Sequence, residues 1–252
     1  QYIRAEAQAG RLGHRLTTVV VSRGRGGGRH YRLPTDAELA CSNKAEQVLQ
    51  RLSSGAPFHG TDGLWAYNLP LVPDEPSRLI SAAKQTSVAA SYGLLQWGKF
   101  FNPRQLLALI TFGKWVRAVY RQILEQTADP EFAKAVATIL AGVLDFVANR
   151  NSVLCFWDTQ KEVLYQVFAT HALKMAWDYA ESSPLSHSIG SWSSGLGWSY
   201  EFLKRESTVG LSGQAHLGSA ANLPFSDNSF DCVVIDPPYA DNVPYADLSD
   251  FF

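Results

Sequence analysis

At positions 230–239 the sequence reads Phe230-Asp231-Cys232-Val233-Val234-Ile235-Asp236-Pro237-Pro238-Tyr239, and this stretch decides the predicted fold. Its centre, Val233 to Ile235, is a β-branched run typical of a strand that is buried on both faces of a parallel sheet. The loop Asp236–Tyr239 follows the run directly. Because ligands in open α/β sheets bind beyond the carboxyl ends of strands, the sequence predicts a functional site at this loop.

The loop carries groups suited to an amino group on a planar ring. Asp236 and the carbonyl oxygen of Pro237 each accept a hydrogen bond, and Pro237 and Pro238 have a fixed φ, which makes the loop rigid. Tyr239 offers an aromatic face on which a planar ring stacks. These groups favour an exocyclic amine of a nucleobase, and they suit adenine and cytosine equally. A simple turn after a strand is the alternative interpretation.

The loop resembles the signature of S-adenosylmethionine-dependent amino-methyltransferases, which modify adenine or cytosine in DNA. Residues 218–231 are similar to the segment that precedes the catalytic strand in Rossmann-like methyltransferases. Three further stretches resemble a narrower family, the DUF1156-containing adenine-specific DNA methylases: 69–76, 101–107 and 241–252. The resemblance covers most of residues 30–252. It implies an adenine-specific DNA methyltransferase with four catalytic residues, Asp236, Pro237, Pro238 and Tyr239.

The resemblance also implies S-adenosylmethionine as cofactor. The turn Gly218-Ser219-Ala220 matches the position that meets the cofactor's adenine ring, although relatives often carry Asp where Ser219 stands. Asp236 is expected to contact the cofactor as well. Phe101 and Pro103 match an aromatic-x-Pro start of a helix beside the cofactor, although helix capping by Asn102 explains the same residues.

The Gly-rich loop that holds the cofactor's methionine part is not found in the sequence. The resemblance therefore implies that this loop lies upstream of Gln1, and that residues 1–252 are an internal or C-terminal piece without activity of its own. Restriction or anti-phage defence partners are a further expectation. The alternative functions are methylation of cytosine N4, methylation of an RNA base, and a non-catalytic DNA-binding fragment.

The composition is that of a globular protein, with 46% apolar residues and a formal net charge of −1. Charge is unevenly distributed: residues 1–33 contain seven Arg and one Glu, whereas residues 206–252 contain seven acidic residues and no Lys or Arg. The basic end is either a phosphate-binding arm or a solvated hairpin. The cysteines are far apart, which argues against a zinc site and favours a reducing cytoplasm. No apolar run is long enough to span a membrane.

Local patterns predict most of the remaining elements. Strands at 16–21 and 30–33 flank a Gly-rich turn, and a helix from Thr35 or Asp36 to Leu52 leads into an irregular connection at 53–78. Asn102-Pro103 and Asp129-Pro130 predict the starts of two helices, ending near Gln126 and Asn149, that pair as an antiparallel hairpin. Further expectations are a helix at 160–181, a long loop at 182–197, and a short strand at 208–211.

Together these patterns predict an α/β fold: a partial Rossmann-like methyltransferase sheet with a large helical insertion and an N-terminal β-hairpin. The expected divisions are a basic hairpin (1–35), a helix with an irregular connection (36–100), the helical insertion (101–205) and the catalytic strands (206–252).

Overall fold

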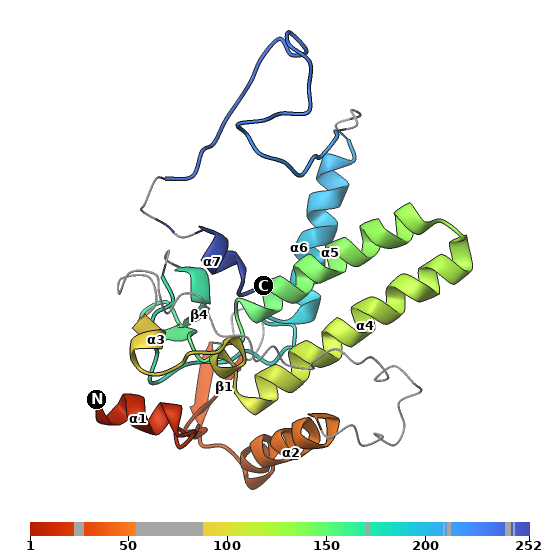
Figure 1. Ribbon diagram of the computed structural model, residues 1–252. Coiled ribbons are helices and arrows are strands. Elements are labelled where there is room, and N and C mark those ends of the chain that lie inside the picture. Colours follow the sequence, from red (N-terminus) through yellow and green to blue (C-terminus); the bar gives the residue numbers. More distant parts are fainter. Residues whose placement is uncertain are drawn as a thin grey trace.

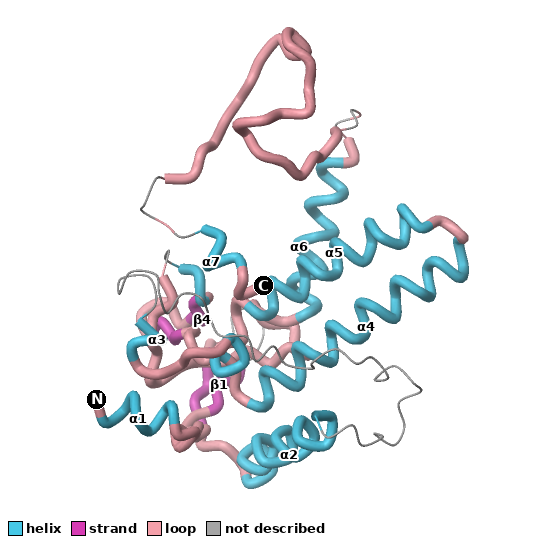
Figure 2. The backbone as a smooth tube through the Cα atoms, viewed as in Figure 1, coloured by secondary structure: helices cyan, strands magenta, loops and turns pink. Residues whose placement is uncertain are grey.

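The computed structural model describes residues 1–22, 28–53, 88–169, 172–208, 210, 213–239, 243 and 245–252. Over these residues the protein is mixed α/β, with long helices and two small antiparallel sheets (Figures 1 and 2). The α-helices are α1 (Tyr2–Gln8), α2 (Asp36–Ser53), α3 (Val88–Ser91), α4 (Pro103–Thr127), α5 (Pro130–Ala148), α6 (Trp192–Glu206) and α7 (Tyr245–Ser249). Two 3-10 segments are η2 (Trp97–Phe100) and η3 (Val167–Ala169). The strands are β1 (Val19–Ser22), β2 (Arg29–Arg32), β3 (Phe156–Asp158) and β4 (Val163–Tyr165).

Helices α4 and α5 form the antiparallel hairpin that the sequence predicts (Figure 1). Asn102 caps α4, since its side-chain oxygen accepts hydrogen bonds from the backbone N–H groups of Arg104 and Gln105 at 2.9 and 3.0 Å. The Gln105 side chain accepts from the Asn102 N–H in return, which completes a capping box. Ala128 takes a left-handed conformation that ends α4, and Asp129 caps α5. The two predicted helices are confirmed.

The predicted hairpin and the helix that follows it are confirmed, but the first strand begins at Val19 rather than at residue 16, and α1 was not predicted. Strands β1 and β2 pair antiparallel, with Val19 opposite Arg32 and Ser22 opposite Arg29. Helix α2 begins with a reciprocal pair of contacts between Thr35 and Glu38. The Gly-rich turn at 23–27, the connection at 54–87 and the resembling stretch at 69–76 within it lie outside the described residues.

The predicted helix at 160–181 is wrong. Residues of β3 and β4 pair antiparallel here, with Phe156 opposite Tyr165, and η3 follows. The rings of Phe156 and Tyr165 stack with centroids 4.9 Å apart. Glu162, at the start of the return strand, has a left-handed φ of 50°, which breaks a helix. Cross-strand aromatic packing therefore outweighs the helical spacing of the apolar residues.

The predicted loop at 182–197 is wrong from Trp192 onward, where α6 begins. Ser191 caps this helix by accepting from the Ser194 N–H at 3.2 Å. Gly195 faces α5, and a Cβ atom there would lie 2.8 Å from the Phe146 ring and 3.1 Å from Val143. The glycine that indicates a loop in the sequence is thus required for close packing of two helices.

The predicted buried strand at Val233–Ile235 is not formed in this structure. Residues 213–239, which we call the projecting segment, leave the end of α6 and run away from the helices as irregular chain (Figures 1 and 2). Val234 is 90% exposed, and no backbone hydrogen bond among the described residues involves positions 230–239. A β-branched run forms a strand only with a neighbouring strand. At the expected neighbour, 208–211, the two described residues, 208 and 210, are not in a strand.

The core lies beside β4 and the two 3-10 segments, at the start of α4, the end of α5 and the C-terminal end of the chain. Its fully buried side chains include Phe100, Cys155 and Leu173, and Leu248 and Phe251 pack against them from α7 and beyond. In the part of the chain that the structure describes, no helix has the length and apolar character needed to cross a membrane.

Candidate functional site

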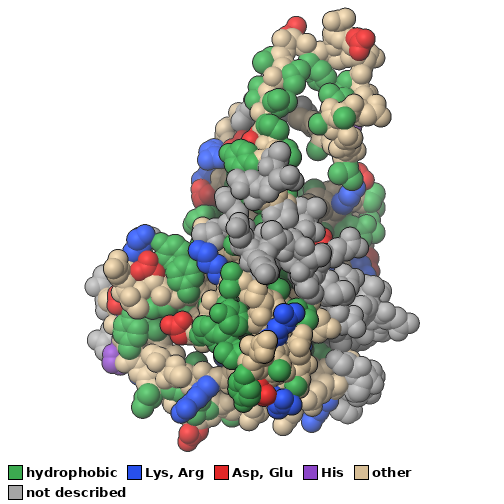
Figure 3. Space-filling model, turned by 60° about the vertical axis from the view of Figure 1, so that its left-hand side comes forward, with side chains coloured by type: hydrophobic (Ala, Val, Ile, Leu, Met, Phe, Trp, Pro, Cys, Tyr) green, Lys and Arg blue, Asp and Glu red, His purple; other side chains and the backbone are tan. Residues whose placement is uncertain are grey.

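The Asp236–Tyr239 loop lies on the projecting segment and is open to solvent. Asp236 makes no hydrogen bond or ion pair within the described residues. Tyr239 is 65% exposed, and its ring contacts no other described aromatic side chain. The acceptors and the aromatic face that the sequence predicts are therefore accessible to a ligand. The space-filling view shows hydrophobic side chains along this projecting part of the molecule (Figure 3).

The loop is tethered closely to the body of the protein. Val243, four residues after Tyr239, packs against the core. Four residues of extended chain span at most about 14 Å between Cα atoms, so Tyr239 stays within that distance of Val243. After α7, Phe251 is 8% exposed and lies within the core. The C-terminal return thus limits how far Tyr239 can lie from the core.

Phe101 and Pro103 lie where this return meets the body. The Phe101 and Phe251 rings are inclined at 37° with their centroids 5.5 Å apart. Pro103 is the first residue of α4. The structure therefore links the predicted cofactor segment at α4 to the chain that carries Asp236–Tyr239, through Phe251.

The Gly218-Ser219-Ala220 turn is on the projecting segment. The Asn222 N–H donates to the Ser219 carbonyl at 3.0 Å, and the Ala221 N–H donates to the Ser219 hydroxyl at 3.2 Å. All these residues are exposed. A tight turn therefore forms where the sequence places one.

The residues expected to hold S-adenosylmethionine do not form one site in this structure. No hydrogen bond or ring contact among the described residues joins the turn at 218–220 to Phe101 or Pro103. The face of Phe101 is partly covered by Phe251, and Asp236 stands alone on the projecting segment. The arrangement of these residues therefore does not fit the cofactor.

A polar cluster at the start of α4 was missed by sequence reasoning. The Asn102 side-chain amide donates to the Tyr179 hydroxyl at 2.9 Å and to the Glu181 carboxylate. Arg104 pairs with the same carboxylate at 2.6 Å and donates to the Ser42 hydroxyl of α2. Burial raises the pKa of Tyr179, which keeps its hydroxyl protonated. The only signal in the sequence was the cap at Asn102-Pro103; its distant partners have no local signature.

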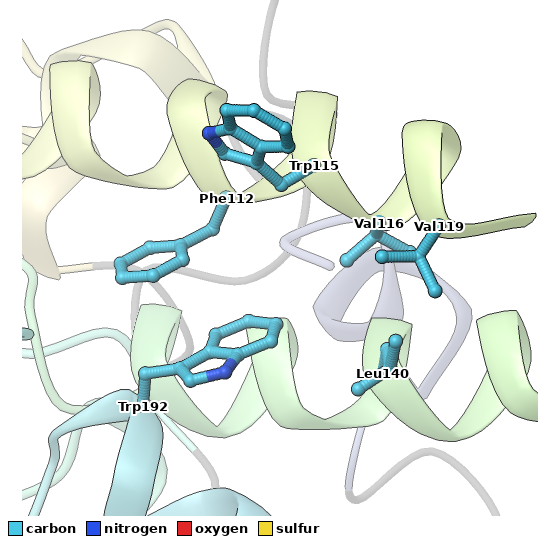
Figure 4. A pocket seen from close by; sticks show the side chains of 6 residues that line it. All are labelled: Phe112, Trp115, Val116, Val119, Leu140 and Trp192. Atoms are coloured by element: carbon cyan, nitrogen blue, oxygen red, sulfur yellow. The ribbon is translucent and has the colours of Figure 1, made fainter. Parts of the chain in front are cut away.

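An apolar pocket of about 310 Å³ lies between α4, α5 and the start of α6 (Figure 4). The Phe112 and Trp192 rings stack at 4.6 Å with their planes 3° apart. The remaining lining residues are Trp115, Val116, Val119 and Leu140. None of the lining side chains is charged, and none was predicted as a site residue.

Two of the five described arginines in the basic N-terminal region, Arg11 and Arg32, pair with acidic side chains. Arg11 pairs with Glu6 at 2.7 Å, and Arg32 pairs with Glu38 at 2.7 Å. The Arg32 guanidinium, together with Thr35, lowers the pKa of Glu38 to about 2. Arg29 donates to the Ser22 hydroxyl and to the Glu162 carbonyl. These contacts lie at the surface, so the choice between a solvated hairpin and a phosphate-binding arm stays a prediction.

The exposure of residues 230–236 can be measured through Cys232. We expect maleimide to label Cys232 as fast as Cys41, because both thiols are exposed. Cys155 is expected to react only after unfolding, because burial raises the pKa of its thiol to about 12. Mass spectrometry of labelled peptides over time gives the three rates. Protection of Cys232 comparable to that of Cys155 would contradict the structure and indicate a buried strand.

Comparison of the sequence with protein-family models and with curated proteins, and comparison of the structure with solved structures, found no match.

Proposed function

We propose that this protein is an S-adenosylmethionine-dependent methyltransferase, or a piece of one, that methylates the exocyclic amine of adenine in DNA. The observation that carries the proposal is the Asp236–Tyr239 loop: two fixed hydrogen-bond acceptors and one exposed aromatic ring directly after a β-branched run. DNA is the proposed partner, and the choice of adenine over cytosine rests on the resemblance of 241–252 and 101–107 to adenine-specific methylases.

Each group of the loop has a defined role toward the amine. Asp236 and the Pro237 carbonyl accept hydrogen bonds from its two protons, which orients the nitrogen lone pair. The Asp236 carboxylate stabilises the positive charge that develops on nitrogen. Tyr239 stacks on the base after it leaves the duplex. The accessibility of Asp236 and Tyr239 supports these roles, since both must approach a base.

The proposal includes a Rossmann-like sheet that takes up Val233–Ile235 as a strand. These three side chains are exposed in this structure, between 69% and 90%. β-branched side chains are stabilised by neighbouring strands and by helices above and below a parallel sheet. The same sheet would carry the methionine-binding Gly-rich loop that the resemblance implies.

The direct test is transfer of labelled methyl groups from S-adenosylmethionine by the full-length protein. Four substrates separate the candidates. In the first duplex DNA only adenine keeps a free exocyclic amine, and in the second only cytosine keeps one. The other two substrates are RNAs with the same two modification patterns. We expect label in adenine of DNA alone. Label in cytosine or in RNA would replace the proposed substrate, and no label in any substrate would favour a non-catalytic DNA-binding protein.

Substitution of Tyr239 tests the stacking role. We expect Tyr239→Ala to weaken binding of DNA containing an unpaired target adenine by about 1–3 kcal/mol, the value of one base–aromatic stack. Tyr239→Phe keeps the ring and is expected to bind as the wild type does. Fluorescence anisotropy measures both affinities, with Tyr200→Ala as a control, because Tyr200 on α6 is similarly exposed. Equal losses in Tyr239→Ala and Tyr200→Ala would contradict a specific role for Tyr239.

A further inference from the structure

The pocket between α4, α5 and the start of α6 has a preformed wall at Trp192. The Trp192 N–H donates to the Pro184 carbonyl at 2.9 Å, and the indole stacks on the Phe112 ring of α4. The Asn151 side chain, which is 2% exposed, donates to the Gly190 carbonyl at 2.9 Å and to a carbonyl of α5 at 3.1 Å. These contacts hold Trp192 in place without a ligand. Binding at this wall therefore needs little ordering of the protein.

The space itself lies where α4 and α5 are lined by small side chains. At Gly113 the two helices are close, since an added Cβ atom would lie 3.5 Å from the Leu144 side chain. One and two turns further along α4, Val116 and Val119 face Leu140 of α5, and their short side chains leave the gap unfilled (Figure 4). The pocket is thus a consequence of the residue sizes along the α4–α5 hairpin.

The lining determines the chemical class of a ligand. None of the lining side chains is charged, so an ionised group would lose its hydration in the pocket without gaining a partner. The only polar groups on the lining side chains are the indole N–H groups of Trp115 and Trp192. Three of the six lining residues are aromatic, and flat rings gain from contact with such side chains beyond the area that they bury.

The volume determines the size of the ligand. An apolar cavity of about 150 Å³ binds benzene. The pocket measures about 310 Å³, roughly twice that volume, and so has room for two fused rings. It opens to solvent beside Trp115, which is 53% exposed, so a ligand can enter without separation of the helices.

We propose that this pocket binds an uncharged, flat aromatic molecule of about two fused rings. The proposal is independent of the proposed methyl transfer, because no pocket residue belongs to the Asp236–Tyr239 loop or to the helix start at Phe101–Pro103. With only two indole N–H groups on its lining side chains, the pocket selects by size and charge rather than by a pattern of hydrogen bonds.

The test uses 5-fluoroindole as the probe and fluorine NMR of the full-length protein as the measurement, since the protein contributes no fluorine signal. The matched control is 5-fluoroindole-2-carboxylate, which has the same rings and an ionised group. We expect the neutral probe to bind at least about tenfold more tightly than the carboxylate. Equal affinities, or no binding of the neutral probe, would overturn the proposal.

Two substitutions locate the binding. Val119→Phe and Leu140→Phe each place a ring in the space, from opposite helices, and we expect either to weaken 5-fluoroindole binding by at least about tenfold. Val20→Phe makes the same change as the first on β1, outside the pocket, and is expected to bind as the wild type does. Thermal melts identify the variants that fold, and only those are compared. Unchanged affinity in a folded pocket variant, or an equal loss in Val20→Phe, would overturn the proposed location.

The same titration distinguishes a small ligand from a second copy of the chain as the occupant. A small-molecule site gives the same affinity at every protein concentration. If a second copy covers the pocket, the affinity for 5-fluoroindole falls as the protein concentration rises, and sedimentation equilibrium shows a dimer that Val119→Phe disrupts. That pair of results would overturn the proposal and assign the pocket to an interface.

Discussion

Replacing Asp236 by Asn is expected to lower methyl transfer to DNA by about 10²- to 10³-fold, the usual cost of removing one preorganised group that stabilises developing charge. Asparagine keeps a hydrogen-bond acceptor of the same shape but has no negative charge to offset the positive charge on the amine nitrogen. Because Asp236 is exposed and without a described partner, the substitution should leave folding unaffected. Initial rates with labelled S-adenosylmethionine at saturating DNA measure the effect.

Asp231→Asn is the matched control. Asp231 lies five residues upstream on the projecting segment, is also exposed, and undergoes the same change of charge. We expect this variant to retain wild-type activity, which would exclude a general effect of negative charge on DNA binding. Equal rates for Asp236→Asn and the wild type would remove the chemical basis of the proposed function.

Asn102→Ala is expected to cause a large loss of stability. It removes the cap of α4, and it leaves Tyr179 and Glu181 without the amide that donates to them. Adding the cost of a lost cap to that of partly buried groups left unpaired gives a decrease of about 2–4 kcal/mol in the free energy of unfolding. Urea denaturation followed by tryptophan fluorescence measures this change.

Asp129→Ala provides the comparison, because Asp129 caps α5 but is exposed and makes a single side-chain bond to the Phe132 N–H. Its loss should lower the free energy of unfolding by about 1 kcal/mol, the typical value of one exposed cap. If the two variants are equally destabilised, the polar cluster around Asn102 contributes no stability beyond capping.

Local chemistry predicted three helices, α2, α4 and α5. The α4–α5 hairpin follows from Asn102-Pro103 and Asp129-Pro130 together with apolar residues at helical spacing, and these signals act within one or two turns. The Thr35–Glu38 start of α2 is equally local. Such elements depend little on the rest of the chain, so their boundaries can be predicted from short windows of sequence.

The errors arose where long-range packing decides the structure. Gly195 lowers helix propensity, yet α6 forms because this glycine allows contact with Phe146 of α5. Phe156 and Tyr165 join β3 to β4 through stacked rings, and the apolar spacing at 160–181 did not reveal this pairing. Val233–Ile235 has the composition of a buried strand, but a strand also needs a neighbour, which composition does not supply.

The candidate site was predicted in part. The chemical groups of Asp236–Tyr239 were evident from the sequence, as was the helix start at Phe101–Pro103. The contact that links these segments could not be predicted from the sequence. Phe251 has no motif around it, and its partners lie in distant parts of the chain. Only the structure shows that an aromatic ring after α7 joins them.

The packing of Phe251 on Phe101 has a consequence for the order in which the protein folds during synthesis. Phe251 follows Phe101 by 150 residues (251 minus 101), whereas α4 and α5 pair through a turn of two residues. At about 5–20 residues per second, the ribosome needs roughly 8–30 s to reach Phe251 after Phe101 is made. During that time the rings of Trp97 and Phe101 lack their cover. The newly made chain therefore exposes this aromatic surface until Phe251 packs on it.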